Sequence, residues 1–176
     1  MRIAYFTEQD FVQLIDWIPN AAFMMQWGGP AFSYPLTNEQ LADYLDGANT
    51  EAATKYIFKV LNDKDEVIGH ISFKDVNREL GTARVGKVLI GSNIRGKGYG
   101  TKMMMAALAF AFEQLKLKKV TLGVFDFNES AIRCYEKVGF QQEAFLQNAR
   151  QFEGEYWNLI EMGISYNKWK QSICST

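Results

Sequence analysis

The residues RGKGYG at positions 95–100 separate a predicted strand, residues 85–91, from a predicted helix, residues 101–115. Glycines at such a junction let the backbone approach a ligand closely and adopt positive φ angles. The free amides and the dipole of the following helix attract an anion, and Arg95 and Lys97 add positive charge beside them. The stretch therefore predicts a phosphate-binding loop, with a strand-to-helix turn that holds no ligand as the alternative.

Two common nucleotide-binding loops do not fit these residues. The P-loop of nucleoside triphosphatases has four residues between its glycines, followed by Gly-Lys-Ser/Thr, which this stretch lacks. The dinucleotide loop has the spacing G-x-G-x-x-G near the start of a βαβ unit. Here Gly96, Gly98 and Gly100 have the spacing G-x-G-x-G in the second half of the chain. The loop is therefore assigned to neither class.

The composition is that of a folded globular protein. The chain has 176 residues, enough for one domain with a sizeable core, and 48% of them are hydrophobic while 22% are charged. The net charge of −1 argues against a nucleic-acid partner bound by bulk electrostatics. Cys134 and Cys174 are expected to be free thiols in a reducing cytosol. Neither a membrane span nor a signal sequence is apparent, so we expect a cytoplasmic protein without a membrane partner.

The first half of the chain predicts a strand at 2–6, a helix after Thr7, a second helix from 37–38 to 47, and strands at 54–61, 67–73 and 82–90. The strand at 54–61 alternates apolar residues with lysines, which is typical of a strand buried on one face. His70 lies on the face opposite the apolar residues of its strand. We therefore expect it at the surface or in a second layer and not as a ligand.

Residues 20–37, NAAFMMQWGGPAFSYPLT, are expected to be irregular because Gly28-Gly29-Pro30 interrupts any helix. A loop this long and this apolar is uncommon unless it packs over something. One interpretation is a wall of the substrate site that includes Trp27, Phe32 and Tyr34. The other is a loop that closes the core.

The second half of the chain predicts a strand at 120–125, a helix from Asn128 to Val138, and a final hairpin. The hairpin strands are expected at 140–152 and 156–164, with a turn at 153–155. A short helix or tail follows at 165–170.

A second motif lies downstream of the glycine loop. Residues 128–140, NESAIRCYEKVGF, match the pattern N-x-x-A-x-x-x-Y-x-x-x-G-F. With R-x-x-G-x-G at 95–100 and the predicted order of elements, the chain resembles the GNAT superfamily of acyl-CoA-dependent N-acyltransferases, and in particular its uncharacterised bacterial members. The resemblance implies a single domain over 1–176 of the α+β class. Its mixed, mostly antiparallel sheet of about seven strands would be splayed at the coenzyme site, with helices on both faces.

The resemblance also implies a site for acetyl-CoA and no metal. The pyrophosphate would bind the amides of residues 96–101, and the strand at 88–90 would pair with the pantetheine arm. Tyr135 would protonate the leaving thiolate, and a backbone amide near Leu89 would stabilise the oxyanion. The implied coenzyme-binding residues are Val88, Leu89, Ile90, Arg95, Gly96, Lys97, Gly98, Tyr99, Gly100, Thr101 and Asn128.

The general base is left open. Many members of the superfamily carry a Glu on the strand before the loop, whereas residues 83–87, ARVGK, contain no carboxylate. Glu79, Glu155, Glu161 or no dedicated base are the alternatives. The predicted substrate-binding residues are Trp27, Phe32, Tyr34 and Glu155.

The predicted function is transfer of an acetyl group from acetyl-CoA to a primary amine of a small molecule or peptide. A non-catalytic acyl-CoA-binding regulatory module is one alternative, favoured by the missing carboxylate. A protein N-terminal acetyltransferase, with residues 20–37 gripping a peptide, is the other. The chain is expected to act as a monomer or homodimer.

Overall fold

The computed structural model describes residues 1–174, with side chains up to residue 173. The thiol predicted at Cys174 therefore lies outside the described part, whereas Cys134 is a free thiol as predicted. The elements are β1 (Arg2–Tyr5), α1 (Phe11–Asp16), α2 (Ala21–Gly28), α3 (Asn38–Leu45), β2 (Tyr56–Leu61), β3 (Val67–Asn77), β4 (Thr82–Ile90), α4 (Tyr99–Ala109), β5 (Lys119–Phe125), α5 (Glu129–Lys137), β6 (Gln141–Phe152), β7 (Glu155–Ser165) and α6 (Tyr166–Cys174).

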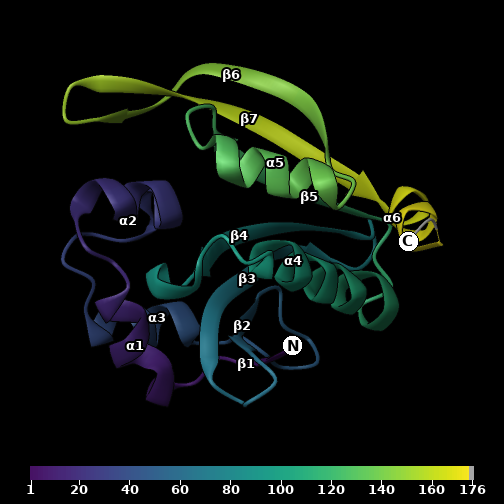
Figure 1. Cartoon of the computed structure of the whole chain (residues 1–176), viewed down its shortest axis with the longest axis horizontal. Coiled ribbons are helices and arrows are strands. Elements are labelled where there is room, and N and C mark those ends of the chain that lie inside the picture. Colours follow the sequence, from purple (N-terminus) through teal and green to yellow (C-terminus); the bar gives the residue numbers. More distant parts are fainter. Residues whose placement is uncertain (175–176) are drawn as a thin grey trace.

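A single sheet organises these elements, with the strand order β1-β2-β3-β4-β5-β7-β6 (Figure 1). The β4–β5 pair is parallel, and the other five pairs are antiparallel. The predicted mixed, mostly antiparallel seven-stranded sheet is confirmed. The last hairpin turns at Glu153 and Gly154, both with positive φ, where the sequence predicted a turn.

Helices cover both faces of the sheet. On β2, Phe58 packs into a cluster with residues of α4 and α5, while Ile57 packs with residues of α1, α2 and α3. The prediction that this strand is buried on one face only was therefore wrong. Lys59 reaches the second face and is retained there by an ion pair with Asp10 at 2.9 Å.

The segment 20–37 also differs from the prediction, because much of it is helical. Asn20 caps α2 by accepting a hydrogen bond from the backbone N–H of Phe23 at 2.8 Å. Met24 and Trp27 are buried and not exposed in a loop. The run AAFMMQW is apolar nearly all round, so it lacks the period by which an amphipathic helix is recognised.

Within the described residues, no helix is both long enough and apolar enough to cross a bilayer.

Candidate active site

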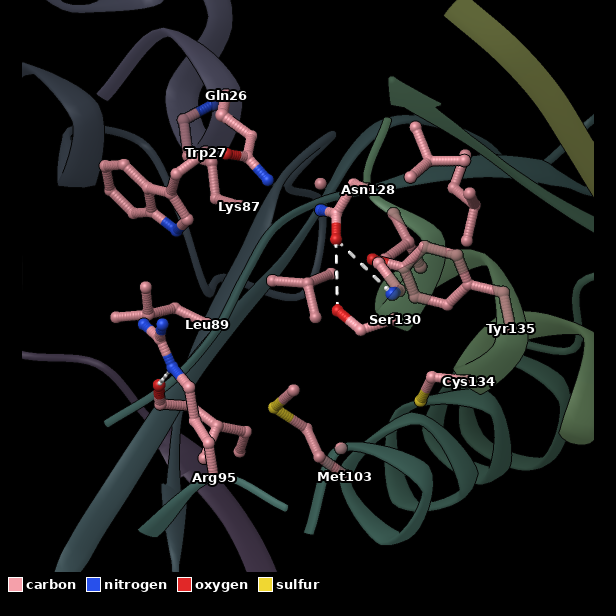
Figure 2. A pocket seen from close by; sticks show the side chains of 18 of the residues that line it. Gln26, Trp27, Lys87, Leu89, Arg95, Met103, Asn128, Ser130, Cys134 and Tyr135 are labelled. Carbon is pink, nitrogen blue, oxygen red and sulfur yellow. Dashed lines mark hydrogen bonds between the residues drawn. The ribbon is translucent and has the colours of Figure 1, made fainter. Parts of the chain in front are cut away.

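The strands β4 and β5 separate soon after they pair. Residues 82–84 of β4 pair with 119–121 of β5, and no pairing continues beyond Arg84. A cavity of about 450 Å³ lies where the two strands diverge (Figure 2). Its lining comes from α2 (Phe23, Gln26, Trp27), β4 (residues 85–90), the glycine loop with the start of α4 (Arg95, Gly96, residues 98–101, Met103), β5 (residues 122–125) and α5 with its cap (Asn128, Ser130, Ala131, Cys134, Tyr135).

A bulge in β4 shapes one wall of this cavity. In the β3–β4 register Ser72 lies opposite Gly86 and His70 lies opposite Leu89. Two residues of β4, Lys87 and Val88, therefore stand against one residue of β3. Lys87 has a φ of 52°, which is the local distortion that a bulge requires. No pattern in the sequence predicted this bulge.

The glycine loop forms one end of the cavity. Gly96 and Gly98 have φ angles of 81° and 75°, as the alternating glycines predicted, and Gly98 is the N-cap of α4. The Nε of Arg95 donates a hydrogen bond to the carbonyl of Ile90 at 2.9 Å, and its guanidinium lies over the ring of Phe23. The amides at the start of α4 therefore face a region that already carries positive charge.

Asn128 and Tyr135 lie across the cavity from β4 (Figure 2). The Oδ1 of Asn128 accepts hydrogen bonds from the hydroxyl of Ser130 at 3.2 Å and from the N–H of Ala131 at 3.4 Å. Asn128 thus caps α5, while its Nδ2 has no hydrogen-bond partner among residues 1–174. Tyr135 is buried against Phe140, and burial raises the pKa of its phenol above the usual value.

A group of rings around a lysine stands on the opposite side, which we call the Lys87 wall: Trp27 and Lys87 line the cavity, and Phe32, Tyr44 and His70 pack behind them. The rings of Trp27 and Phe32 stack at 5.5 Å, and the Nζ of Lys87 lies 5.3 Å from the centre of Phe32 and 5.0 Å from that of Tyr44. Burial, followed by the charges of nearby lysines, lowers the pKa of Lys87 to about 8. The wall therefore holds an ammonium group between aromatic faces.

His70 lies at the back of this wall and is only 1% exposed, so of the two predicted positions it takes the second layer and not the surface. Its Nε2 shares a hydrogen bond with the hydroxyl of Tyr44 at 3.2 Å, and its ring packs against Phe6 and Trp27. Helices α1 to α3 cover the face of β3 that appeared polar in sequence. Burial, followed by the charge of Lys87, lowers the pKa of His70 to about 3.

The three carboxylates considered as general bases lie outside the cavity lining. Glu161 forms a two-pronged ion pair with Arg84, at 2.6 and 2.8 Å, where β4 and β5 begin to part. Gly123 of β5 makes room for it, since a Cβ at that position would lie 2.5 Å from Nη2 of Arg84. Glu79 and Glu155 are exposed. In the part of the chain that is described, the cavity has no carboxylate in its lining.

The predicted site residues divide into two groups. Trp27, Val88, Leu89, Ile90, Arg95, Gly96, Gly98, Tyr99, Gly100, Thr101, Asn128 and Tyr135 line the cavity, while Lys97, Phe32, Tyr34 and Glu155 do not. Phe32 lies behind Trp27, and the hydroxyl of Tyr34 donates to the carbonyl of Pro19. Lys87, Phe23 and Gln26 of α2, and the lining residues of β5 were not anticipated as site residues. A lysine within an otherwise apolar strand was the available signal for Lys87.

Comparison with known proteins agrees with this geometry. A family model described as an acetyltransferase (GNAT) domain matches residues 1–141. The chain belongs to the GNAT acetyltransferase family. The predicted family, fold class and class of enzyme, an N-acetyltransferase, are thereby confirmed.

Individual relatives of this GNAT protein are more distant. The SPbeta prophage-derived uncharacterized N-acetyltransferase YokL of Bacillus subtilis is 30% identical over 111 residues, which are 63% of this chain and 62% of that protein. Aminoglycoside N(6′)-acetyltransferase type 1 of Klebsiella pneumoniae is 28% identical over 148 residues, 78% of this chain and 72% of that protein. A crystal structure of spermidine N-acetyltransferase from Vibrio cholerae, in complex with CoA and spermine, superposes with a TM-score of 0.82 at 22% identity, covering 96% of each chain.

Proposed function

We propose that this chain, as one domain over residues 1–176, transfers an acetyl group from acetyl-CoA to a primary amine by direct attack of the amine on the thioester. The observation that carries the proposal is the cavity between the diverging strands β4 and β5, which joins the glycine loop to Tyr135. A cavity of this form accommodates an extended thioester at one end and an amine at the other.

The glycine loop would bind the pyrophosphate of the coenzyme. The amides of residues 96–101 precede α4, so they have no partner within the helix and the helix dipole favours an anion there. Arg95 adds a full positive charge. Thr101 contributes a hydroxyl, which lies 3.7 Å from the Sγ of Cys134.

The edge of β4 that faces β5 would bind the pantetheine arm. Because pairing with β5 ends at Arg84, backbone groups of residues 88–90 on this edge are free to pair with the amides of the arm, as an added strand would. The Nδ2 of Asn128 is a further donor on the opposite side. A backbone amide near Leu89 would stabilise the oxyanion that forms at the attacked carbonyl.

Tyr135 would act as the general acid. A phenol is protonated at neutral pH, and burial raises the pKa of Tyr135 further, so it holds a proton that it can donate to the thiolate as that group leaves. Since the described cavity lining contains no carboxylate, the proton of the amine would pass to water and not to a dedicated base.

Small amines are the acceptors named for the relatives, an aminoglycoside in one and spermidine in another. A small-molecule or peptide amine is accordingly the proposed substrate class. Three points stay predictions. They are a cytoplasmic location, a monomeric or homodimeric state, and the absence of metal, nucleic-acid and membrane partners. No group of three or more metal-ligating side chains occurs among residues 1–174.

Two measurements test this function. Calorimetric titration with acetyl-CoA should show binding, and a lack of binding at millimolar ligand would contradict the proposal. Release of free CoA in the presence of a panel of primary amines should then follow. If acetyl-CoA binds but no amine releases CoA, the alternative of a non-catalytic acyl-CoA-binding module is supported instead. If only peptide amines release CoA, the N-terminal acetyltransferase is supported.

A further inference from the structure

The ammonium group of Lys87 has no anionic partner. Within the described residues, it forms no ion pair and no hydrogen bond, and its contacts are the rings of Phe32 and Tyr44. Lys87 stands at the bulge in β4 and is one of the residues that line the cavity. A partly buried cation without a carboxylate has a large gain available from binding one.

The charges around the cavity are all of one sign. Among the described lining residues the charged ones are Lys87 and Arg95, and Arg95 belongs to the glycine-loop end. Carboxylates outside the lining are paired with other cations: Glu129 with Arg133, Glu161 with Arg84, and the exposed Asp75 on β3, whose charge also acts on Lys87, with Lys74.

Lys87 also lies on a part of β4 that acetyl-CoA would not occupy, so the acceptor amine could bind there. It precedes residues 88–90, which would pair with the pantetheine arm, and the glycine loop follows them. Figure 2 shows Lys87 beside Gln26 and Trp27, across the cavity from Asn128 and Tyr135. The Nε1 of Trp27 is a further buried donor on this wall without an acceptor. This wall thus offers hydrogen-bond donors and a positive charge, and no carboxylate of the described residues lines it.

We propose that the acceptor is a small amine that also carries a carboxylate, and that Lys87 binds that carboxylate. The inference rests on the proposed acetyltransferase function. An acceptor with a carboxylate would differ from the aminoglycoside and the spermidine that two relatives are named for, because those two molecules carry several positive charges. A second ammonium on the acceptor would meet the positive charge of Lys87 where no carboxylate is present to neutralise it. A carboxylate at the same place would complete an ion pair that is partly shielded from water.

The test compares amines that differ in the charge of the tail alone. Butylamine, 4-aminobutyrate and putrescine have the same chain length and a neutral, an anionic and a cationic tail, and the six-carbon series repeats the comparison. We expect kcat/KM, followed by release of free CoA, to be highest for the anionic tail. The expected advantage over the neutral tail is between about 10- and 100-fold, the range for a hydrogen bond to a charged group. The cationic tail should be the poorest.

Variants of Lys87 provide the second arm. Lys87→Met keeps the length and the packing of the stem against Phe32 and Tyr44, so it should remove the preference for the anionic tail over the neutral one. Lys87→Glu should reverse the order and favour putrescine. Lys64→Met is the control, because Lys64 is an exposed lysine in the turn between β2 and β3, outside the cavity lining and not among the charges that act on Lys87. It should retain the wild-type order.

Several results would overturn the inference. Turnover of putrescine that equals or exceeds that of 4-aminobutyrate would do so, as would an unchanged order in Lys87→Met. If none of the amines is turned over, calorimetry of the CoA-loaded protein gives the same comparison as dissociation constants. Absence of a preference for the anionic tail there also contradicts the proposal. A failure to bind acetyl-CoA would instead refute the proposed function, so the two failures are distinguishable.

Discussion

The glycine-loop end and the Lys87 wall bound one cavity, but they are made of different parts of the chain. The glycine-loop end uses backbone amides, and two of its glycines hold positive φ angles. The Lys87 wall uses side chains from α2, α3, β3 and β4 that pack as a group of rings around one cation.

This difference follows from what each end would bind. A pyrophosphate is the same in every acyl-CoA, so amides at a helix N-terminus suffice and side chains matter little. An acceptor amine differs from one enzyme to the next and is distinguished by shape and charge. Side chains that differ between relatives can provide that discrimination without altering the coenzyme site. The predictions below test whether the two ends can be perturbed separately.

Tyr135→Phe should have the largest effect, because Tyr135 would act on the thiolate that lies between the two ends. Loss of the general acid should lower kcat by about 100- to 10,000-fold. The dissociation constant of CoA, measured by calorimetry, should stay within about twofold, since a phenyl ring fills the same space. Tyr156→Phe, at an exposed tyrosine, is the control and should leave kcat unchanged. A loss of CoA affinity as large as the loss of kcat would instead mean that Tyr135 has a packing role.

Acidification should weaken the fold through the Lys87 wall. His70 has a folded-state pKa of about 3, against an ordinary value of 6.5. Above pH 6.5 it is neutral in both states, whereas between pH 6.5 and 3 the unfolded chain takes up a proton that the folded chain excludes. From pH 7 to pH 5 this costs about 2 kcal/mol of the free energy of unfolding.

Urea unfolding at pH 7 and pH 5 measures the change, and His70→Gln separates it from the titration of carboxylates. The variant should lose about 2 kcal/mol less than the wild type over this interval. An equal pH dependence in the two proteins would show that His70 does not carry the effect.

Gly98→Ala should perturb the opposite end. Gly98 has a φ of 75°, and no atom lies within 4 Å of a Cβ added there, so the backbone angle alone is strained. The strain for a residue with a side chain is about 1–2 kcal/mol. If the loop relieves this strain by rotating its amides, the amides no longer point at the pyrophosphate. We therefore expect the dissociation constant of acetyl-CoA, measured by calorimetry, to rise by up to roughly 10-fold.

Gly47→Ala is the matched control for this strain, since Gly47 has a φ of 66° and open space around it but lies outside the cavity lining. It should lower thermal stability by a similar amount and leave coenzyme binding unchanged. The order of preference among acceptor amines should be the same in both variants. A changed order in Gly98→Ala would mean that the two ends are coupled.

Glu155→Gln and Glu79→Gln should have the smallest effects. Both residues are exposed and outside the cavity lining, so kcat/KM between pH 6 and 9 should change by less than about twofold. Loss of the ascending limb of the pH profile in either variant would identify a general base and contradict proton transfer to water.

The sequence by itself determined the glycine loop, the helix that follows Asn128 and the final hairpin. The spacing of Gly96, Gly98 and Gly100, the residues 128–140 and the hairpin turn are local patterns. A glycine at positive φ, a capping Asn and a two-residue turn each act within a few residues of themselves, so sequence is enough to locate them.

Only the tertiary structure decided the Lys87 wall and the cavity beside it. Residues 21–28 form a helix although their apolar residues show no helical period, and the packing buries Met24 and Trp27 among them. His70 is buried because helices distant in sequence close over a face of β3 that appears polar. The bulge at Lys87 depends on the register between β3 and β4, and the cavity exists because β5 leaves β4 after Arg84. These features arise from contacts between segments far apart in the chain, and such contacts leave no periodic pattern in the sequence.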